Sequence, residues 1–127
     1  LNFLDEVIQS IGIKNTSLVH IRLEDAGRAA KFREKYDVVT ARAVARMSVL
    51  AEYCLPLVKP GGYFYAMKGL DGEHETREAR VMIEKMGGSV ARIEWVRIRD
   101  DFADETLRHS VVVIQKIKQT PKIYPRR

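Results

Sequence analysis

The sequence lacks the features that mark secreted, disulfide-bonded, zinc-binding and membrane-spanning proteins. Cys54 is its single cysteine, which excludes a disulfide within the chain and fits a reducing compartment. No cysteine–histidine spacing suggests zinc, and no apolar run approaches the ~18 residues typical of a membrane span. The opening residues LNFLDE carry no basic segment, so they are unlike a signal peptide. We therefore expect a cytoplasmic protein without a metal or a membrane partner.

The chain does contain enough apolar residues for a core, and its charge is unevenly spread. Of its 127 residues, 46% are hydrophobic and 31% are charged, which suits one globular domain over residues 1–127. The whole net charge of +5 resides in the last twenty residues, because six Lys or Arg and no Asp or Glu occur from Arg108 onward. Such a basic tail suits a polyanion such as RNA, or is a solvated tail that aids solubility. Charge alone does not separate these two interpretations.

The stretch 36–69 carries the most informative pattern in the chain. Residues 37–40, DVVT, are typical of a short buried parallel strand. Residues 43–58 follow at helical spacing, and Pro60-Gly61-Gly62 then favours a stop and a turn. Residues 63–67, YFYAM, again favour a strand. The pattern predicts a β-α-β unit with two neighbouring parallel strands.

Two cations follow these two strands. Arg42 comes just after the first strand, and Lys68 stands where the second would end. Ligands of parallel sheets bind beyond the carboxyl ends of the strands. Arg42 and Lys68 are therefore expected at the mouth of a binding site.

The remaining elements complete an α/β layer fold. Alternating helices and strands indicate a mostly parallel sheet, and the short connection between the last two strands predicts an antiparallel hairpin at the C-terminal end. The other expected elements are a helix over 1–11 ended by Gly12, a strand over 17–21, a helical turn within 26–35, a helix over 71–86 ended by Gly87-Gly88, and strands over 89–99 and 109–118 joined by the acidic loop 100–107.

Seven segments, in their order and spacing, resemble the RsmG (GidB) family, which methylates guanine N7 in 16S ribosomal RNA with S-adenosyl-L-methionine. No single segment is decisive, but together they run along almost the whole chain. The segments are LNFLDEV (1–7), VHIRLED (19–25), YDVVTARAVA (36–45), LPLVKPGG (55–62), AMKG (66–69), RH (108–109) and TPKIYPR (120–126).

The resemblance implies a Rossmann-like class I methyltransferase fold, and the terminal hairpin is a feature of that fold. It also implies a partner, the 16S ribosomal RNA of the small subunit. By position, the implied cofactor-binding residues are Leu23, Glu24 and Arg42, and the implied RNA-binding residues are Arg22, Lys68 and Arg108. The alternatives are a solvated loop, surface charge or, for Arg42, an ion pair with Glu24 or Asp25.

No catalytic side chain is assigned, because the expected chemistry asks for alignment more than for a base. Guanine N7 has an in-plane lone pair and no proton to remove, so methyl transfer from a sulfonium needs orientation above all. Cys54 falls on the apolar face of the helix expected over 43–58, where a core position is more typical than a covalent catalyst.

The sequence departs from the family in one important respect. No glycine-rich loop of the G-x-G-x-x-G kind occurs, and Gly61-Gly62 and Gly87-Gly88 belong to turns that end helices. The chain is similar to the C-terminal part of the family protein, without the first two strands that lie between the third and fourth in class I methyltransferases. We expect the chain alone to be inactive and to have an open strand edge that favours self-association.

Two other functions stay open. The chain could be a non-enzymatic basic RNA-binding module, which would bind RNA in a salt-sensitive way without a cofactor. It could also be a class I methyltransferase that acts on another substrate.

Overall fold

A computed structural model describes residues 2–12, 14–42, 45–97 and 108–126 of the chain. No helix in these described ranges is long and apolar enough to cross a membrane. The elements are α1 (Asn2–Ile11), α2 (Leu23–Arg28), β1 (Tyr36–Arg42), α3 (Met47–Cys54), the 3-10 helix η1 (Leu55–Leu57), β2 (Val58–Lys68), α4 (Gly72–Glu78), α5 (Arg80–Lys85), β3 (Gly88–Arg97) and β4 (Arg108–Lys116).

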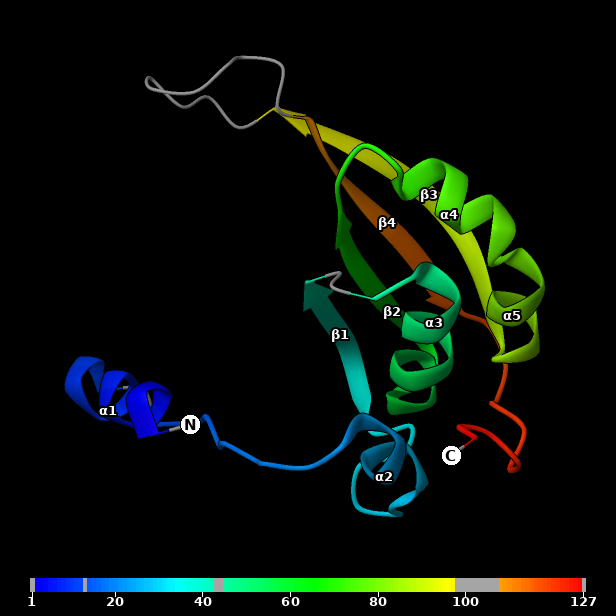
Figure 1. The fold of residues 1–127 in the computed structure, drawn as a ribbon. Coiled ribbons are helices and arrows are strands. Elements are labelled where there is room, and N and C mark those ends of the chain that lie inside the picture. Colours follow the sequence, from blue (N-terminus) through cyan, green and yellow to red (C-terminus); the bar gives the residue numbers. More distant parts are fainter. Residues whose placement is uncertain (1, 13, 43–44, 98–107, 127) are drawn as a thin grey trace.

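The four strands form one mixed sheet in the order β1-β2-β4-β3 (Figure 1). β1 and β2 run parallel, whereas β4 is antiparallel to both β2 and β3. The predicted β-α-β unit and the predicted C-terminal hairpin are therefore confirmed, and so is the α/β class. β4 enters the sheet between β2 and β3, so the described sheet contains one parallel and two antiparallel pairings and is mixed, where a mostly parallel sheet was predicted. The loop expected over 100–107 lies outside the described residues.

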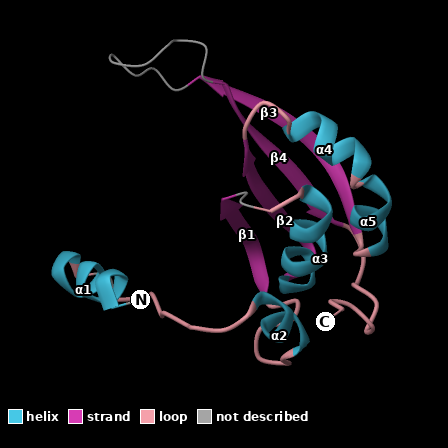
Figure 2. Ribbon diagram, in the orientation of Figure 1, coloured by secondary structure: helices cyan, strands magenta, loops and turns pink. Residues whose placement is uncertain are grey.

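The core lies between the sheet and the helices α3, α4 and α5, which Figure 2 shows along the same side of the strands. Alternation along β2 explains this, because Phe64 and Ala66 are buried whereas Tyr63 and Tyr65 are half-buried. Ile114 of β4 joins Phe64 in the same fully buried cluster.

Proline and glycine shorten the helix that was expected over 43–58. α3 ends at Cys54, and Pro56 lies in the 3-10 turn that follows, where the missing N–H cannot continue an α-helix. The predicted turn Pro60-Gly61-Gly62 lies inside β2 instead of before it. Gly61 has φ of +93°, and the pairing of β1 with β2 is irregular at this point.

The helix expected over 71–86 is divided in two. Ala79, with φ of −86° and ψ of 0°, closes α4 and opens α5. Gly87 follows α5 with φ of +92°, and a Cβ there would lie 2.2 Å from the Lys118 carbonyl oxygen. The predicted glycine stop is thus confirmed, and it also lets the chain after β4 approach closely.

The strand predicted over 17–21 is wrong, because this segment is extended but pairs with no strand. The prediction of a buried first parallel strand is also wrong: β1 is an edge strand of the described sheet, with Val38 51% exposed. In both places a strand partner is missing, because the segment 17–21 pairs with no strand and β1 pairs on one side only among the described residues. Helix α1 stands apart from the sheet at the other end of this segment (Figure 1).

The C-terminal residues 117–126, here called the strap, are packed against the fold and do not form the solvated tail that was one of the two interpretations. Thr120 is 4% exposed and donates a 2.6 Å hydrogen bond to the Met86 carbonyl oxygen. The Arg33 guanidinium donates to the carbonyl oxygens of Thr120 and Tyr124 at 3.0 and 2.7 Å.

The end of the strap is held by an ion pair. The side chain of Arg126 binds the Glu52 carboxylate, and these hydrogen bonds lower the pKa of that carboxyl.

A lysine lies in the interior where the strap begins. The Lys116 side chain is fully buried, and its ammonium donates to the carbonyl oxygens of Leu55 and Val58 at 2.6 and 2.8 Å. The nearest carboxylate oxygen, Glu34 Oε2, is 3.7 Å from Lys116 Nζ. Burial lowers the pKa of Lys116 from 10.5 to about 8.

This buried lysine predicts that the free energy of unfolding rises with pH in alkaline solution. Below pH 8 both states hold the proton, so the folded state carries the full cost of a buried charge. Between pH 8 and 10.5 the folded state loses the proton first, and stability should increase by up to ~3 kcal/mol. Urea unfolding at several pH values measures it. Lys116→Met should abolish the rise, whereas Lys122→Met at an exposed position should keep it; an equal rise in both variants would contradict the assignment.

Candidate functional site

Three cations lie at the end of the sheet where β1 and β2 finish. Arg42 is the last residue of β1 and pairs in register with Met67, one residue before Lys68. Lys68 pairs with Ser110 of β4, and Arg108 is the residue that begins this strand. The backbone therefore brings Arg42, Lys68 and Arg108 to the same end of the sheet, because the parallel strands β1 and β2 finish there and the antiparallel strand β4 begins there.

Arg42 is an accessible cation at this end of the sheet. Its side chain is exposed, and it forms no ion pair with the residues that the structure describes. The predicted alternative, pairing with Glu24, does not occur, because α2 lies at the opposite end of β1. A guanidinium in this position can bind a phosphate or a carboxylate through two parallel hydrogen bonds.

Lys68 was predicted to be an RNA-binding residue, but the structure places its side chain in the interior. Its side chain is only 6% exposed, and its ammonium points inward. It donates to the Ala45 carbonyl oxygen at 2.5 Å and to Glu75 Oε1 at 3.0 Å. A cation held in this way cannot also contact a polyanion outside the protein. Lys68 therefore supports the structure behind the edge, and the role predicted for it at RNA is not favoured.

Glu75 of α4 is the partner that sequence reasoning missed. Its Oε1 accepts the hydrogen bond from Lys68 and one from the Met47 backbone N–H, at 3.0 and 3.3 Å. This carboxylate thereby joins the end of β2, the start of α3 and the segment that follows β1. Nothing in a single sequence distinguishes Glu75 from its acidic neighbours in α4, so no signal in the sequence could have identified it.

The other three predicted site residues lie elsewhere. Arg22 is the N-cap of α2, and Leu23 and Glu24 are its first two residues. Figure 1 places α2 beside the amino end of β1, a strand of seven residues that spans about 23 Å. The expectation that they join Arg42 at the carboxyl edge is not met, because the segment 17–21 does not enter the sheet and so cannot carry them there.

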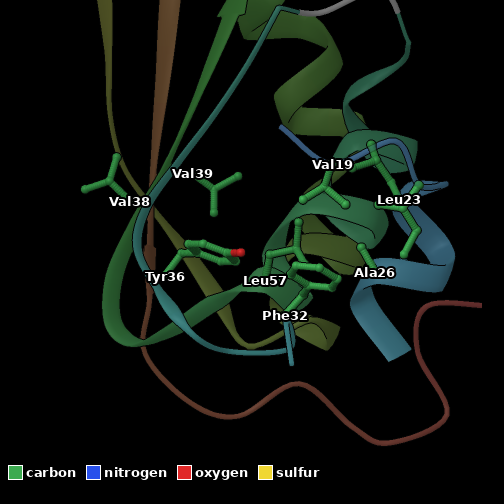
Figure 3. A pocket seen from close by; sticks show the side chains of 9 residues that line it. Val19, Leu23, Ala26, Phe32, Tyr36, Val38, Val39 and Leu57 are labelled. Carbon is green, nitrogen blue, oxygen red and sulfur yellow. The ribbon is translucent and has the colours of Figure 1, made fainter. Parts of the chain in front are cut away.

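An apolar pocket of about 290 Å³ lies near α2 and β1, and Leu23 is one of its lining residues (Figure 3). Side chains from the extended segment before α2 face those of β1 across it. No charged side chain lines the pocket, and Glu24 and Arg42 are not part of it. The lining residues are Val19, Ile21, Leu23, Ala26, Phe32, Tyr36, Val38, Val39 and Leu57.

Covalent chemistry has little support among the described residues. Cys54 is 2% exposed, and burial raises the pKa of its thiol to about 12. The predicted core position of Cys54 is confirmed, and such a thiol is not a nucleophile at neutral pH. Within the described ranges, no three His, Cys, Asp or Glu side chains gather where they could hold a metal ion.

The comparison with protein families settles where the chain belongs. Residues 1–102 match the sequence model of the GidB family, described as rRNA small subunit methyltransferase G. The chain belongs to the GidB family. A GidB relative from Lactobacillus johnsonii, a ribosomal RNA small subunit methyltransferase G, is 50% identical over 99% of this chain. One from Desulforamulus reducens is 46% identical over the whole chain. The chain spans about half the length of these relatives, 51% of each.

Solved structures confirm the class I methyltransferase fold for this GidB chain. The TYW2 protein of M. jannaschii, crystallised with AdoMet, superimposes with a TM-score of 0.61 at 16% identity, over 91% of this chain and 53% of its own. An rRNA methylase from Streptococcus thermophilus gives a TM-score of 0.57 at 15% identity, over 90% and 65%. At these identities the likeness concerns the fold alone.

The buried position of Lys68 predicts a large loss of stability on its removal. Lys68→Met leaves the Ala45 carbonyl and the Glu75 carboxylate without their cation, and we expect a loss of about 3 kcal/mol in urea unfolding. Arg46→Met is the matched control, because its 2.7 Å pair with Glu78 is exposed and should contribute less than about 1 kcal/mol. A small loss for both variants would mean that Lys68 is solvated, as a contact with RNA would require.

Proposed function

We propose that this chain is part of an enzyme that methylates guanine N7 in 16S ribosomal RNA of the small subunit, with S-adenosyl-L-methionine as the methyl donor and the cytoplasm as its location. The observation that carries the proposal is the match to the GidB family over residues 1–102, joined by relatives at 46–50% identity. The class I fold supports the choice of methyl donor.

In this proposal, the RNA lies against the end of the sheet where β1 and β2 finish. Arg42 is exposed there, and Arg108 begins the strand two residues before the partner of Lys68. We assign to them the orientation of the RNA backbone near the reacting base. Lys68 and Glu75 act behind them by holding residues 45–47. Arg22 could join the RNA-binding residues only if the segment 17–21 formed a strand of the sheet and so carried Arg22 to this end.

The described residues do not by themselves fit the complete methyl donor. Its amino and carboxylate groups need polar partners, but the pocket that contains Leu23 is lined by apolar side chains apart from Tyr36 and contains no charged one. Glu24 and Arg42, which the family resemblance places around the same cofactor, lie at opposite ends of β1. We therefore propose that the rest of the longer protein pairs with the free edge of β1 and completes the cofactor site with these three residues.

The reaction itself fits the side chains of this edge. Methylation at N7 uses a lone pair that is already available, so a general base is not required. What the protein must supply is the alignment of the base with the donor, and fixed cations that hold the RNA backbone serve this purpose. The inert Cys54 thiol argues against methyl transfer through a covalent cysteine adduct.

A chimera tests the proposal. This chain would replace the matching residues of the Lactobacillus johnsonii relative, to which it is 50% identical. Small subunits from a strain that lacks the modification would be incubated with radiolabelled S-adenosyl-L-methionine. We expect methylation at guanine N7 by the chimera and none by the chain alone. Arg42→Ala in the chimera should lower kcat/KM by about tenfold or more, because one charge-assisted contact is lost.

The outcome that contradicts the proposal is a folded chimera that binds the methyl donor but leaves guanine N7 unmodified. Methylation of another RNA would favour a different substrate. RNA affinity without any binding of the donor would favour the non-enzymatic RNA-binding module. Arg77→Ala, at an exposed position on α4, is the control and should leave kcat/KM unchanged.

The free edge of β1 also leads us to propose that the chain alone associates with itself. Val38 is 51% exposed on an edge strand, next to the apolar pocket, and such edges pair with other chains. Sedimentation equilibrium at increasing concentration should show dimers or larger species. Val38→Lys should shift the chain toward monomer, whereas Val81→Lys on α5 should not. A monomeric wild-type chain with a single cooperative melting transition would refute this.

A further inference from the structure

Four basic side chains lie around the strap, at the amino end of β1 and β2. Lys118 and Lys122 belong to the strap, Lys85 lies in the last turn of α5, and Arg28 lies in the last turn of α2. All four are exposed. We call them the basic strap surface. It lies at the opposite end of the sheet from Arg42.

Two hydrogen bonds to backbone carbonyl oxygens bring these residues together from distant parts of the chain. The backbone N–H of Lys118 donates to the Gly87 carbonyl oxygen at 3.2 Å, which places Lys118 beside the end of α5 and Lys85. The Arg28 guanidinium donates to the Pro125 carbonyl oxygen, which places α2 beside the end of the strap. Lys122 lies between these two attachments. The strap thus brings its two lysines between the end of α5 and the end of α2.

Few carboxylates neutralise this surface. Glu24 and Asp25 precede Arg28 by four and three residues in α2, so they lie on its side of the helix and offset its charge, which leaves the three lysines as the cations that carry the surface. Glu84 pairs with Arg80 at 3.6 Å, and Glu52 is bound by Arg126. The Lys85, Lys118 and Lys122 side chains form no ion pair in the part of the chain that the structure describes.

The strap holds its lysines in fixed positions. Arg33 donates four hydrogen bonds to backbone carbonyl oxygens, of Gly27, Thr120, Pro121 and Tyr124, at 2.7–3.0 Å. Three of these carbonyls belong to the strap and flank Lys122. The half-buried Arg33 and the buried Lys116 lie beneath the surface and are not free to bind a ligand themselves, and Glu34, with carboxylate oxygens 3.9 and 3.7 Å from them, offsets part of their charge. A fixed backbone reduces the entropy lost when a ligand binds.

We propose that the basic strap surface binds the phosphate backbone of RNA and gives the protein a second contact, remote from the Arg42 edge. Its lysines carry point charges suited to phosphates and no base-reading pattern, so the contact orients the RNA without reading its sequence. An anionic membrane is the weaker candidate, because interfacial binding uses an amphipathic helix with a broad apolar face, whereas the strap is an irregular segment. This second contact rests on the proposed function in one respect only, which is that the nucleic acid is RNA.

The experiment measures the affinity of the chain for RNA without any methyl donor. The probe is a fluorescently labelled RNA hairpin of mixed sequence, titrated at several salt concentrations. Lys85→Gln, Lys118→Gln and Lys122→Gln are combined in one variant, which leaves the Arg28 contact with the strap intact. We expect this variant to bind about tenfold more weakly near 0.1 M salt. The slope of log affinity against log salt should become shallower by about 2.

The matched control removes three exposed cations elsewhere on the chain, with Lys14→Gln, Arg77→Gln and Arg92→Gln, and should change affinity by less than about threefold. Circular dichroism melting confirms that both variants are folded. Equal losses in both variants, or no measurable binding by the wild-type chain, would overturn the proposal. Binding to vesicles of anionic lipid that exceeds binding to RNA would overturn it too. None of these outcomes depends on methyl transfer, so a failure here differs from a failure of the proposed activity.

Discussion

The outer edge of β1 has no neighbouring strand among the residues that the structure describes, and this constraint decides where the other parts lie. The segment 17–21 forms no strand there, and its Val19 and Ile21 face β1 only across the apolar pocket. Arg22, Leu23 and Glu24 consequently stay at the amino end of β1 with α2. The apolar pocket and the isolated position of α1 have the same origin.

The rest of the fold is held by buried and half-buried cations that bind backbone carbonyl oxygens. Lys68 binds Ala45, Lys116 binds Leu55 and Val58, and Arg33 binds four carbonyls around the strap. Each of these side chains joins segments that no helix or strand connects, and each leaves unsatisfied polar groups if it is removed. The positive charge of the chain is therefore partly structural. The cations left for the RNA contacts that we propose are exposed ones, with Arg42 at one end of the sheet and the strap lysines at the other.

The sequence predicts local elements well and long-range partners poorly. Residues 36–69 contain a whole β-α-β unit, so their pattern was enough to predict two parallel strands with Arg42 and Lys68 at the same edge. The terminal hairpin was likewise predictable from its short connection. The state of 17–21 was not, because a β-branched segment forms a strand only beside a partner. The burial of Lys68 was equally unpredictable, since it depends on Ala45 and Glu75, and a lysine after a strand is more often solvated.

The central claim is that the free edge of β1 is where the longer protein completes its cofactor site. Hydrogen exchange at the β1 amides that do not face β2 tests it most directly, measured in this chain and in the same residues within the longer chimera. The account predicts fast exchange in the chain alone and strong protection in the chimera, because those amides gain strand partners. Equally fast exchange in both proteins would contradict it.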